Sequence, residues 1–134
     1  MMKKIKEVIE ISGLSRRTIQ YYDDIGLLEN RRSSENYRLY DDEDLQRIWE
    51  IILYKKMGFH LDEIIRLLSE DENNISIMLE RKAVSIGQKI SELRKTLDFV
   101  EKVIDCGMPN MNVEGSKTYG MTLTEMAMQL FEKS

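Results

Sequence analysis

The spacing of hydrophobic and polar positions changes along this chain, and the changes mark separate elements. Residues 5–12 carry apolar side chains at helical spacing and stop at Gly13, which predicts a first short helix. Ser15 can cap a second helix, because its hydroxyl can accept a hydrogen bond from a backbone N–H one turn further on. That helix is expected to end near Gly26, since glycine readily takes the positive φ of a helix C-terminus. Two short helices joined so closely form a helix-turn-helix candidate.

Helical spacing is lost between residues 27 and 40, where the pattern favours two short strands. Residues 33–36 predict the turn between them, and Asn36 tolerates the left-handed geometry that such a turn requires. A hairpin that follows a helix-turn-helix is a wing. On spacing alone the two helices could also form an ordinary helical hairpin in some core, and the spacing by itself favours that interpretation over DNA binding.

Two further helices are predicted after the hairpin. The first begins at the run DDED, whose acidic side chains complement the positive N-terminus of a helix, and it ends at Gly58. The second runs from Leu61 to about Ser69. Trp49 is interpreted as a core residue rather than as a platform for a ligand. The expected buried positions of the two helices are Leu45, Ile48, Trp49, Ile52, Leu53, Leu61, Ile64, Ile65 and Leu68.

The longest regular pattern is a heptad repeat in the second half of the chain. Its apolar positions recur at alternating intervals of four and three residues, which predicts a coiled coil. These seam residues are Leu79, Ala83, Ile86, Ile90, Leu93, Leu97, Val100 and Ile104. A helix of roughly 30 residues is about 45 Å long, too long to pack wholly onto a small domain. A second copy of the helix is the natural partner, because the alternative, an intramolecular hairpin, needs a second long helix that the sequence lacks.

A short element is expected after the long helix. The long helix should stop near Cys106, because Pro109 cannot continue it. Residues 108–121 are loop-like, and Thr122 with Glu125 predicts a capping box for a last short helix. The apolar face of that helix needs cover from the coiled coil or from a partner subunit, and it consists of Leu123, Met126, Ala127, Leu130 and Phe131.

The composition suits a soluble helical protein, with 134 residues, 42% apolar and 33% charged. No apolar run approaches the roughly 20 residues of a membrane span, and the N-terminus lacks the apolar core of a signal peptide. The expected location is therefore the cytoplasm, at the nucleoid. Cys106 is the only cysteine and His60 the only histidine, which excludes an intrachain disulfide and a metal site built on histidine alone. An enzyme is not predicted, since no phosphate-binding loop or dinucleotide fingerprint is present.

The charge balance is not that of a broadly basic nucleic-acid-binding protein. The net charge is −4, from 20 basic and 24 acidic side chains. A protein can nevertheless present one positive face while it is acidic overall. The basic residues that gather locally are Arg16, Arg17, Arg31, Arg32, Arg38, Lys55 and Lys56.

Three motifs, SRRTIQYYDDIGLL, NYRLYDDEDLQRI and KKMGFHLDEI, resemble those of the MerR family of bacterial transcription regulators in order and spacing. The resemblance covers about residues 4–69 in sequence and extends through the coiled coil in architecture. It implies a mainly α fold, in which a winged helix-turn-helix precedes a long antiparallel coiled-coil dimerisation helix and a short C-terminal helix. The expected domains are 1–70 for DNA binding, 73–106 for dimerisation, and 107–134 for a loop with the last helix.

The resemblance also implies which residues bind DNA. The matching positions are Arg16, Arg17, Thr18, Tyr21 and Tyr22 in the recognition helix, Tyr37 and Arg38 in the first wing, and Lys56 in a second wing. Arginine can bond guanine edges or phosphates with two donors, and tyrosine hydroxyls suit phosphate oxygens. Tyr22 is expected to be partly structural. The chain departs from the family's pattern where Gln20 replaces an arginine, Asn36 a glycine and Asn30 a proline.

Family members are homodimers, and many activate promoters whose two recognition elements lie too far apart. They bend and untwist the spacer so that RNA polymerase can engage it. The resemblance therefore implies a regulator of a two-fold promoter operator, with promoter DNA, a second copy of the chain and RNA polymerase as partners and no membrane. The rival interpretation is a coiled-coil interaction module whose helix-turn-helix binds a protein.

No cofactor is predicted, and the inducing signal is open. Short metal-sensing relatives use a cysteine pair after the long helix, whereas Cys106 stands near that place alone. Met108 and Met111 follow it, and thioether sulfur can bind Cu(I). The alternative is that these methionines fill gaps in an apolar contact. In an antiparallel dimer centred near Ile90 the two Cys106 residues would lie far apart, so no disulfide between subunits is expected.

Overall fold

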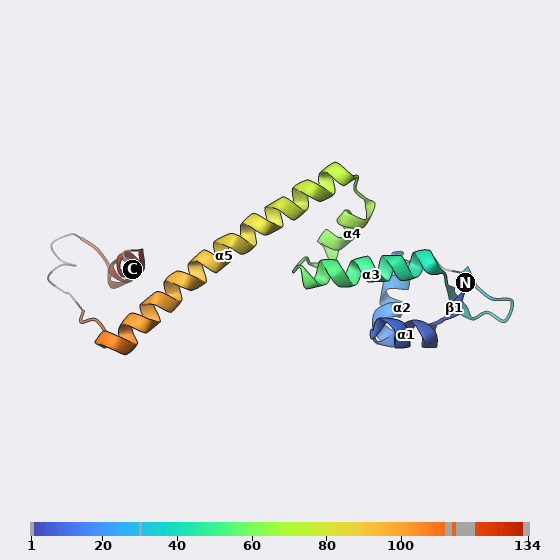
Figure 1. Ribbon diagram of the computed structural model, residues 1–134, viewed down its shortest axis with the longest axis horizontal. Helices are drawn as coiled ribbons and strands as arrows, with labels where there is room; N and C mark the ends of the chain where they lie inside the picture. The colour runs from blue at the N-terminus through green and yellow to red at the C-terminus, as the bar shows by residue number, and fades with distance from the viewer. Residues whose placement is uncertain (1, 30, 112–113, 115–119, 133–134) are drawn as a thin grey trace. The chain divides into compact units, whose positions relative to one another are not determined.

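The computed structural model describes residues 2–29, 31–111, 114 and 120–132. The chain divides into two compact units, Met1–Ile75 and Ser76–Ser134, and each is described by itself (Figure 1). Asn30, one of the three departures from the family's pattern, lies outside the described residues. None of the helices in the described ranges is long and apolar enough to cross a membrane.

The first unit contains the predicted helices and hairpin in the predicted order. Its helices are α1 (Ile5–Ser12), α2 (Arg16–Asp24), α3 (Asp42–Lys56) and α4 (Leu61–Ser69), and its strands are β1 (Lys3–Lys4), β2 (Arg31–Arg32) and β3 (Arg38–Tyr40). The helix α5 (Glu72–Cys106) begins in this unit. The mainly helical, winged helix-turn-helix fold expected from the sequence is thereby confirmed. The strand β1 was not predicted, because two lysines carry no apolar alternation.

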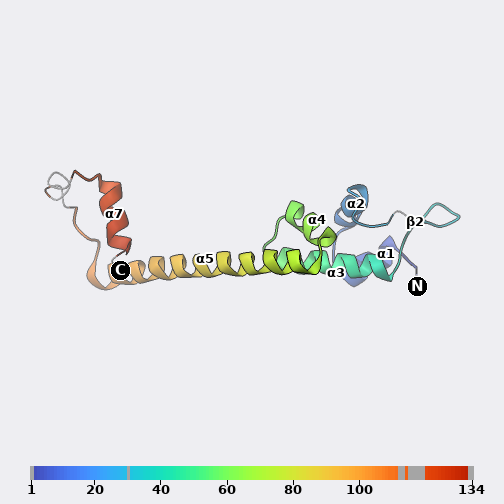
Figure 2. The ribbon, with the colours of Figure 1, turned by 90° about the horizontal axis from the view of Figure 1, so that it is seen from above.

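The sheet is small and antiparallel, in the order β1-β3-β2. Lys3 pairs with Tyr40, and Arg32 pairs with Arg38. The predicted turn lies between β2 and β3, where Asn36 takes a left-handed φ of 70°. The Ser33 hydroxyl accepts from the backbone N–H of Tyr37 at 3.1 Å, which closes the turn. The loop of this hairpin extends away from the helices of its unit (Figure 2).

The caps predicted for α2 are also present. Ser15 Oγ accepts from the backbone N–H of Thr18 at 3.1 Å, and Gly26 takes a φ of 83° just beyond the helix. Gly13 has a φ of 73° between α1 and α2. A side chain at either glycine would be strained in this left-handed conformation, so the short turn depends on glycine.

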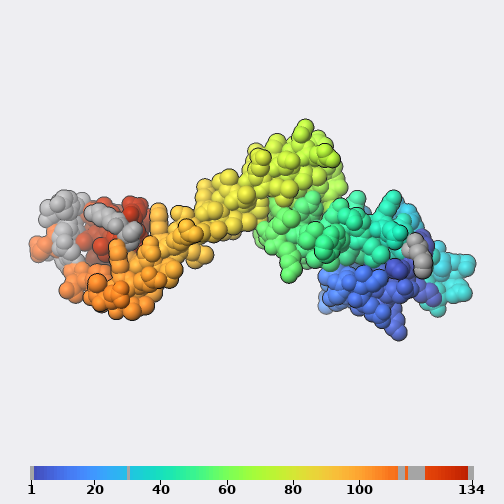
Figure 3. Space-filling view, viewed as in Figure 1, coloured from blue at the N-terminus to red at the C-terminus, as the bar shows by residue number. Residues whose placement is uncertain are grey.

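The core of the first unit gathers one face from each helix. The segments of α1 and α3 abut directly in the space-filling view (Figure 3). The buried apolar residues are Val8, Ile19, Tyr22, Leu27, Leu28, Tyr40, Ile48, Ile51, Phe59, Ile64 and Leu67. Burial of each large side chain stabilises the fold by about 1.5–3 kcal/mol before entropy is counted.

The predicted buried stripes of α3 and α4 were partly wrong. Ile51 and Leu67, which were not expected in the core, are buried, whereas Trp49 is 54% exposed and Ile65 is 40% exposed. Leu53 is also largely exposed. The apolar stripe on these helices is wider than the small core that they cover, so the packing of α3 against α1 and of α4 against α3 selects one side of it.

A buried carboxylate joins α3 to the segment before the hairpin. The Asp44 side chain accepts from the backbone N–H of Glu29 at 3.1 Å and from that of Asp41 at 3.0 Å. Asp41 accepts from the Asp44 N–H in return, which completes a capping box, and Arg31 forms ion pairs with Asp41 and Glu29. Burial raises the pKa of Asp44, against the lowering effect of the Glu29 N–H and of Arg31.

The second unit contains most of α5 together with α7 (Leu123–Glu132). One bond of the capping box predicted for α7 is present, with Thr122 Oγ1 accepting from the Glu125 N–H at 3.2 Å. The rings of Phe99 and Phe131 stack at 4.3 Å between centroids, so α7 packs against the C-terminal half of α5. No described residue of α5 is buried, although α5 carries a continuous apolar seam.

The Asp44→Asn variant is expected to lower the free energy of unfolding by about 1–3 kcal/mol. The reason is that asparagine offers one acceptor oxygen, so one of the two backbone N–H groups would face an NH2 group instead. Urea unfolding followed by circular dichroism measures the change. Glu43→Gln is the control, because it removes a carboxylate from the exposed side of the same helical turn. Equal stability of the two variants would contradict the role given to Asp44.

Candidate nucleic-acid interface

The first turn of α2 presents the basic residues expected to read DNA. Ile19 and Tyr22, one turn apart, point into the core. The exposed residues of the helix include Arg16 and Arg17, and Tyr21, one turn after Arg17, is 49% exposed. Thr18 is half-buried, and its hydroxyl lies 2.9 Å from that of Ser15. The amphipathic packing of α2 therefore turns one polar, basic face outward.

The resemblance implies a DNA-binding role for Tyr22 with the expectation that it is partly structural, and the structure places it in the core. It is 2% exposed, and the Lys55 ammonium lies 5.8 Å from its ring centroid. A ring so enclosed supports α2 from behind and is not presented to a ligand. Of the neighbouring tyrosines, Tyr21 is the one at the surface.

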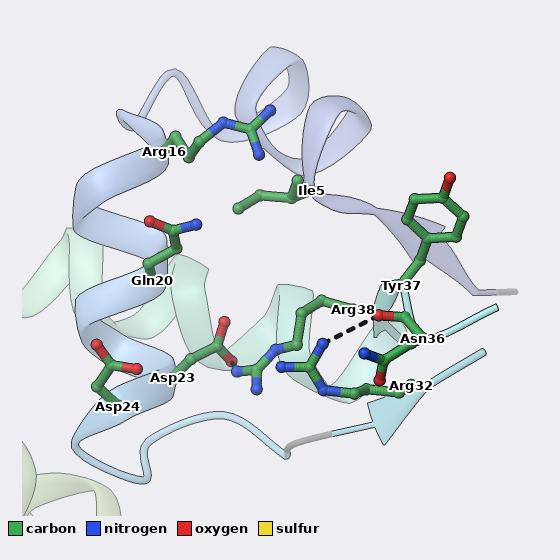
Figure 4. A pocket seen from close by; sticks show the side chains of 9 residues that line it. All are labelled: Ile5, Arg16, Gln20, Asp23, Asp24, Arg32, Asn36, Tyr37 and Arg38. Carbon is green, nitrogen blue, oxygen red and sulfur yellow. Dashed lines mark hydrogen bonds and ion pairs between the residues drawn. The ribbon is translucent and has the colours of Figure 1, made fainter. Parts of the chain in front are cut away.

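A polar hollow of about 420 Å³ lies between α2 and the hairpin (Figure 4). Its lining brings together three predicted residues, Arg16, Tyr37 and Arg38, from segments that are separate in the sequence. It also contains Gln20 and Arg32, which were not among the predicted site residues. The full lining is Ile5, Arg16, Gln20, Asp23, Asp24, Arg32, Asn36, Tyr37 and Arg38.

Arg32 was missed because it stands in a basic pair whose two members have different roles. Arg31 is neutralised by ion pairs with Asp41 and Glu29. Arg32 points the other way, and its Nη1 donates to the backbone carbonyl of Asn36 at 3.0 Å (Figure 4). The alternation of side chains along a strand separates the two residues, and this was the signal available in the sequence.

Arg38, which the resemblance assigns to DNA binding, is held in an internal ion pair. It forms an ion pair with Asp23, whose side chain is only 4% exposed, and the Arg38 side chain is 20% exposed. Tyr40 Oη donates to the other oxygen of Asp23 at 2.6 Å. Burial alone would lower the pKa of Arg38, but the Asp23 carboxylate outweighs it and raises that pKa. Burial, assisted by Asp23, raises the pKa of Tyr40 to about 12.

The tip of the wing is open. Tyr37 is 51% exposed, and the Lys4 ammonium lies 4.4 Å from its ring centroid. This contact contributes about 0.5–1 kcal/mol and adds a positive charge beside the hairpin. Lys4 was not predicted as a site residue, because it belongs to the unpredicted strand β1.

The remaining predicted residues lie elsewhere. Lys56 is exposed as the last residue of α3, next to Gly58 with its φ of 93°, and it does not line the hollow. Cys106, Met108 and Met111 are exposed in the second unit. Among the described residues no group of three or more His, Cys, Asp or Glu side chains is placed to hold a metal ion.

Comparison with protein families gives one match over half of the chain. The family model described as "MerR HTH family regulatory protein" matches residues 3–71. The HTH-type transcriptional regulator HmrR of Rhizobium leguminosarum bv. viciae is 35% identical over 105 residues, which are 72% of this chain and 81% of that protein. The HTH-type transcriptional activator mta of Bacillus subtilis (strain 168) is 37% identical over 119 residues. This match covers 88% of the chain but 44% of mta, so the chain spans less than half the length of that relative.

Solved structures give the same picture. The N-terminal part of the B. subtilis multidrug transporter activator, MtaN, superposes with a TM-score of 0.67 at 32% identity, over 76% of this chain and 97% of that one. HiNmlR, a MerR family regulator lacking the sensor domain and bound to promoter DNA, superposes with a TM-score of 0.56 at 25% identity. The second match covers 90% of this chain and 92% of that one.

An alkaline titration should detect the Tyr40–Asp23 hydrogen bond. Tyrosinate absorbance is expected to show one group with a pKa of about 12, compared with 10.0 for an ordinary tyrosine. Because the folded-state pKa is the higher one, the stabilisation is fully present below pH 10 and is lost as pH rises through about 12. Tyr40→Phe should remove this last step, whereas Tyr37→Phe should leave it in place. A last step that survives in Tyr40→Phe would refute the assignment.

Proposed function

The chain belongs to the MerR family of helix-turn-helix regulatory proteins, and on this premise we propose that it regulates transcription by binding double-stranded promoter DNA as a homodimer. The observation that carries the proposal is the exposed basic first turn of α2 beside a polar hollow shared with the wing. HiNmlR, which superposes on the chain, is itself a regulator bound to promoter DNA.

The recognition helix in this proposal is α2. A helix fits the major groove of DNA, which is about 12 Å wide, and its N-terminal residues then face the base edges. Arg16 and Arg17 occupy that end of α2 on its exposed side, and Tyr21 follows one turn later. Arginine suits guanine edges and phosphates alike, and the tyrosine hydroxyl suits a phosphate oxygen. Thr18 and Lys56 are proposed as further DNA-binding residues.

The wing in this proposal lies along the phosphate backbone. Arg16 and Arg32 stand on opposite sides of the hollow, one on α2 and one on the hairpin (Figure 4). A phosphate between them would meet two guanidinium groups, which supports a backbone contact at this place. Tyr37 at the exposed tip adds a hydroxyl, and Lys4 beside it adds charge. Such contacts fix the register of the protein on the duplex.

The dimer in this proposal forms through α5. The seam residues are Leu79, Ala83, Ile86, Ile90, Leu93, Leu97, Val100 and Ile104, and six of them are between 42% and 75% exposed in the single chain. An exposed heptad seam of this length is stabilised when a second helix covers it. Family resemblance supports an antiparallel coil, in which the two-fold axis is perpendicular to α5 near the centre of the seam. The domains proposed are 1–70, 73–106 and 107–134.

The mode of action proposed is promoter activation. Two copies of the recognition helix, held at a fixed separation by the coil, fit a two-fold operator. Family resemblance supports a mechanism in which the dimer distorts an overlong promoter spacer, so that RNA polymerase can engage the promoter. The relative mta is named a transcriptional activator, in agreement with this direction of regulation.

Arg17→Ala tests the DNA interface. It is expected to weaken binding to a duplex that wild type selects from a random-sequence library, because a charged contact is lost. If that contact is to a phosphate, the slope of log K against log salt should fall by about 0.9. Lys95→Ala, which removes the same charge from the exposed surface of α5, is the control. Binding of Arg17→Ala equal to wild type at every salt concentration would exclude this placement of the interface.

Ile90→Lys tests the dimer. Near the centre of an antiparallel seam this residue faces its own copy, so the variant places two ammonium groups together in an apolar contact. Analytical ultracentrifugation is expected to show a monomer at concentrations where wild type and Lys95→Ala are dimers. Efficient oxidation of wild type to a Cys106-linked dimer would argue against the antiparallel arrangement.

A further inference from the structure

Asp23 is the one residue of α2 that holds two groups of the wing strand. One oxygen of its carboxylate forms the ion pair with Arg38, and the other accepts from Tyr40 Oη at 2.6 Å. Both members of the ion pair are shielded from water at the contacting atoms. The backbone of β3 is bonded to β1 and β2, and α2 reaches it with this side chain.

We propose that Asp23 is a positioning residue which fixes the wing against the recognition helix, and that Arg38 serves this ionic contact rather than a DNA phosphate. The proposal rests on the proposed DNA-binding function. It reassigns Arg38, which the family resemblance placed among the DNA-binding residues of the first wing, and it gives a role to Asp23, which lies within the first motif but was assigned none. We call the group of Asp23, Arg38 and Tyr40 the wing clamp.

The burial of the wing clamp makes it a fixed contact. The Asp23 side chain is 4% exposed and Tyr40 is 0% exposed, so solvent does not compete for these groups. A charge withdrawn from water needs its partner, because an unpaired one keeps the full desolvation cost. The Tyr40 hydroxyl is protonated at neutral pH, as in any tyrosine, and its pKa raised to about 12 by burial and by Asp23 extends its role as a donor to Asp23 into the alkaline range.

The position of the clamp explains how it can control DNA binding. Figure 4 shows Asp23 on α2 and Arg38 on the hairpin pointing toward each other, with Arg16 and Arg32 also facing the hollow. The clamp therefore sets the separation of the two arginines proposed to hold a phosphate. Because β2 and β3 contain two and three residues, the short ladder by itself leaves the hairpin free to tilt.

For Asp23→Asn, the loss of a negative charge and the loss of the wing clamp change the affinity for DNA in opposite directions, and this makes the proposal testable. Removal of a negative charge from a DNA-binding face should strengthen binding to a polyanion. Loss of the clamp should weaken it, because the recognition helix and the wing then no longer match the duplex together. Whether Asp23→Asn raises or lowers the affinity for DNA therefore distinguishes a purely electrostatic role of Asp23 from a positioning role.

The experiment measures the affinity of full-length Asp23→Asn, Arg38→Gln and the double variant for the selected duplex, over a range of salt concentrations. Asp24→Asn is the matched control, since it removes the same charge from the next, exposed position of α2. We expect Asp23→Asn and Arg38→Gln each to weaken binding by roughly tenfold, with equal salt slopes. The double variant should be no weaker than the single ones, because all three lose the same clamp. Asp24→Asn should bind more tightly than wild type, because Asp24 also lines the hollow and its loss removes a negative charge there while the clamp stays intact.

The proposal is overturned if Asp23→Asn binds as tightly as Asp24→Asn. It is also overturned if Arg38→Gln alone lowers the salt slope by about 0.9, the signature of a lost phosphate contact. Circular dichroism of each variant shows whether it is folded, and Tyr40→Phe offers a milder loss of one clamp bond, expected to weaken binding by a smaller factor. If wild type itself binds no duplex at low salt, the proposed function fails, and that result is distinct from failure of the clamp.

Discussion

Two carboxylates withdrawn from water hold the first unit together, and the rest of its arrangement depends on them. Asp44 accepts from backbone N–H groups of Glu29 and Asp41, so it fixes the segment before the hairpin to the start of α3. Asp23 receives Arg38 and Tyr40, so it fixes the end of the hairpin to α2. A buried carboxylate is costly unless its oxygens are satisfied, which makes each contact all-or-none. The strands are too short to hold the wing without them.

The same contacts decide which arginines of this acidic protein remain available at the surface. The arginines of the wing are divided between two tasks. Arg31 and Arg38 form ion pairs with carboxylates of the same chain. Arg32 instead faces the hollow opposite Arg16. The charge that matters for a polyanion is therefore local, whereas the net charge of −4 is a sum over the whole chain. An inventory of basic residues alone would overstate the number available to DNA.

The second unit presents a different physical problem. Its seam is apolar and largely exposed in the single chain, and Phe131 of α7 stacks on Phe99, which is not a seam residue. Exposure of so long an apolar stripe to water is unfavourable, and a second copy of the helix would remove this cost by covering the stripe. The proposed dimer also gives the long helix α5 a role. It would hold the two recognition helices at the fixed separation that a two-fold operator requires.

Periodicity and caps were enough to predict the helices, the wing and the heptad seam, because these features are local. Ser15, Gly26 and Asn36 each act within a few residues of their own position, and the structure confirms all three. Tertiary packing decided the rest. It turned Trp49 outward and Tyr22 inward, since a one-dimensional pattern shows that a face is apolar but not which neighbour will cover it. It also joined Asp23 to Arg38, an ion pair between two elements that only the folded chain brings within reach.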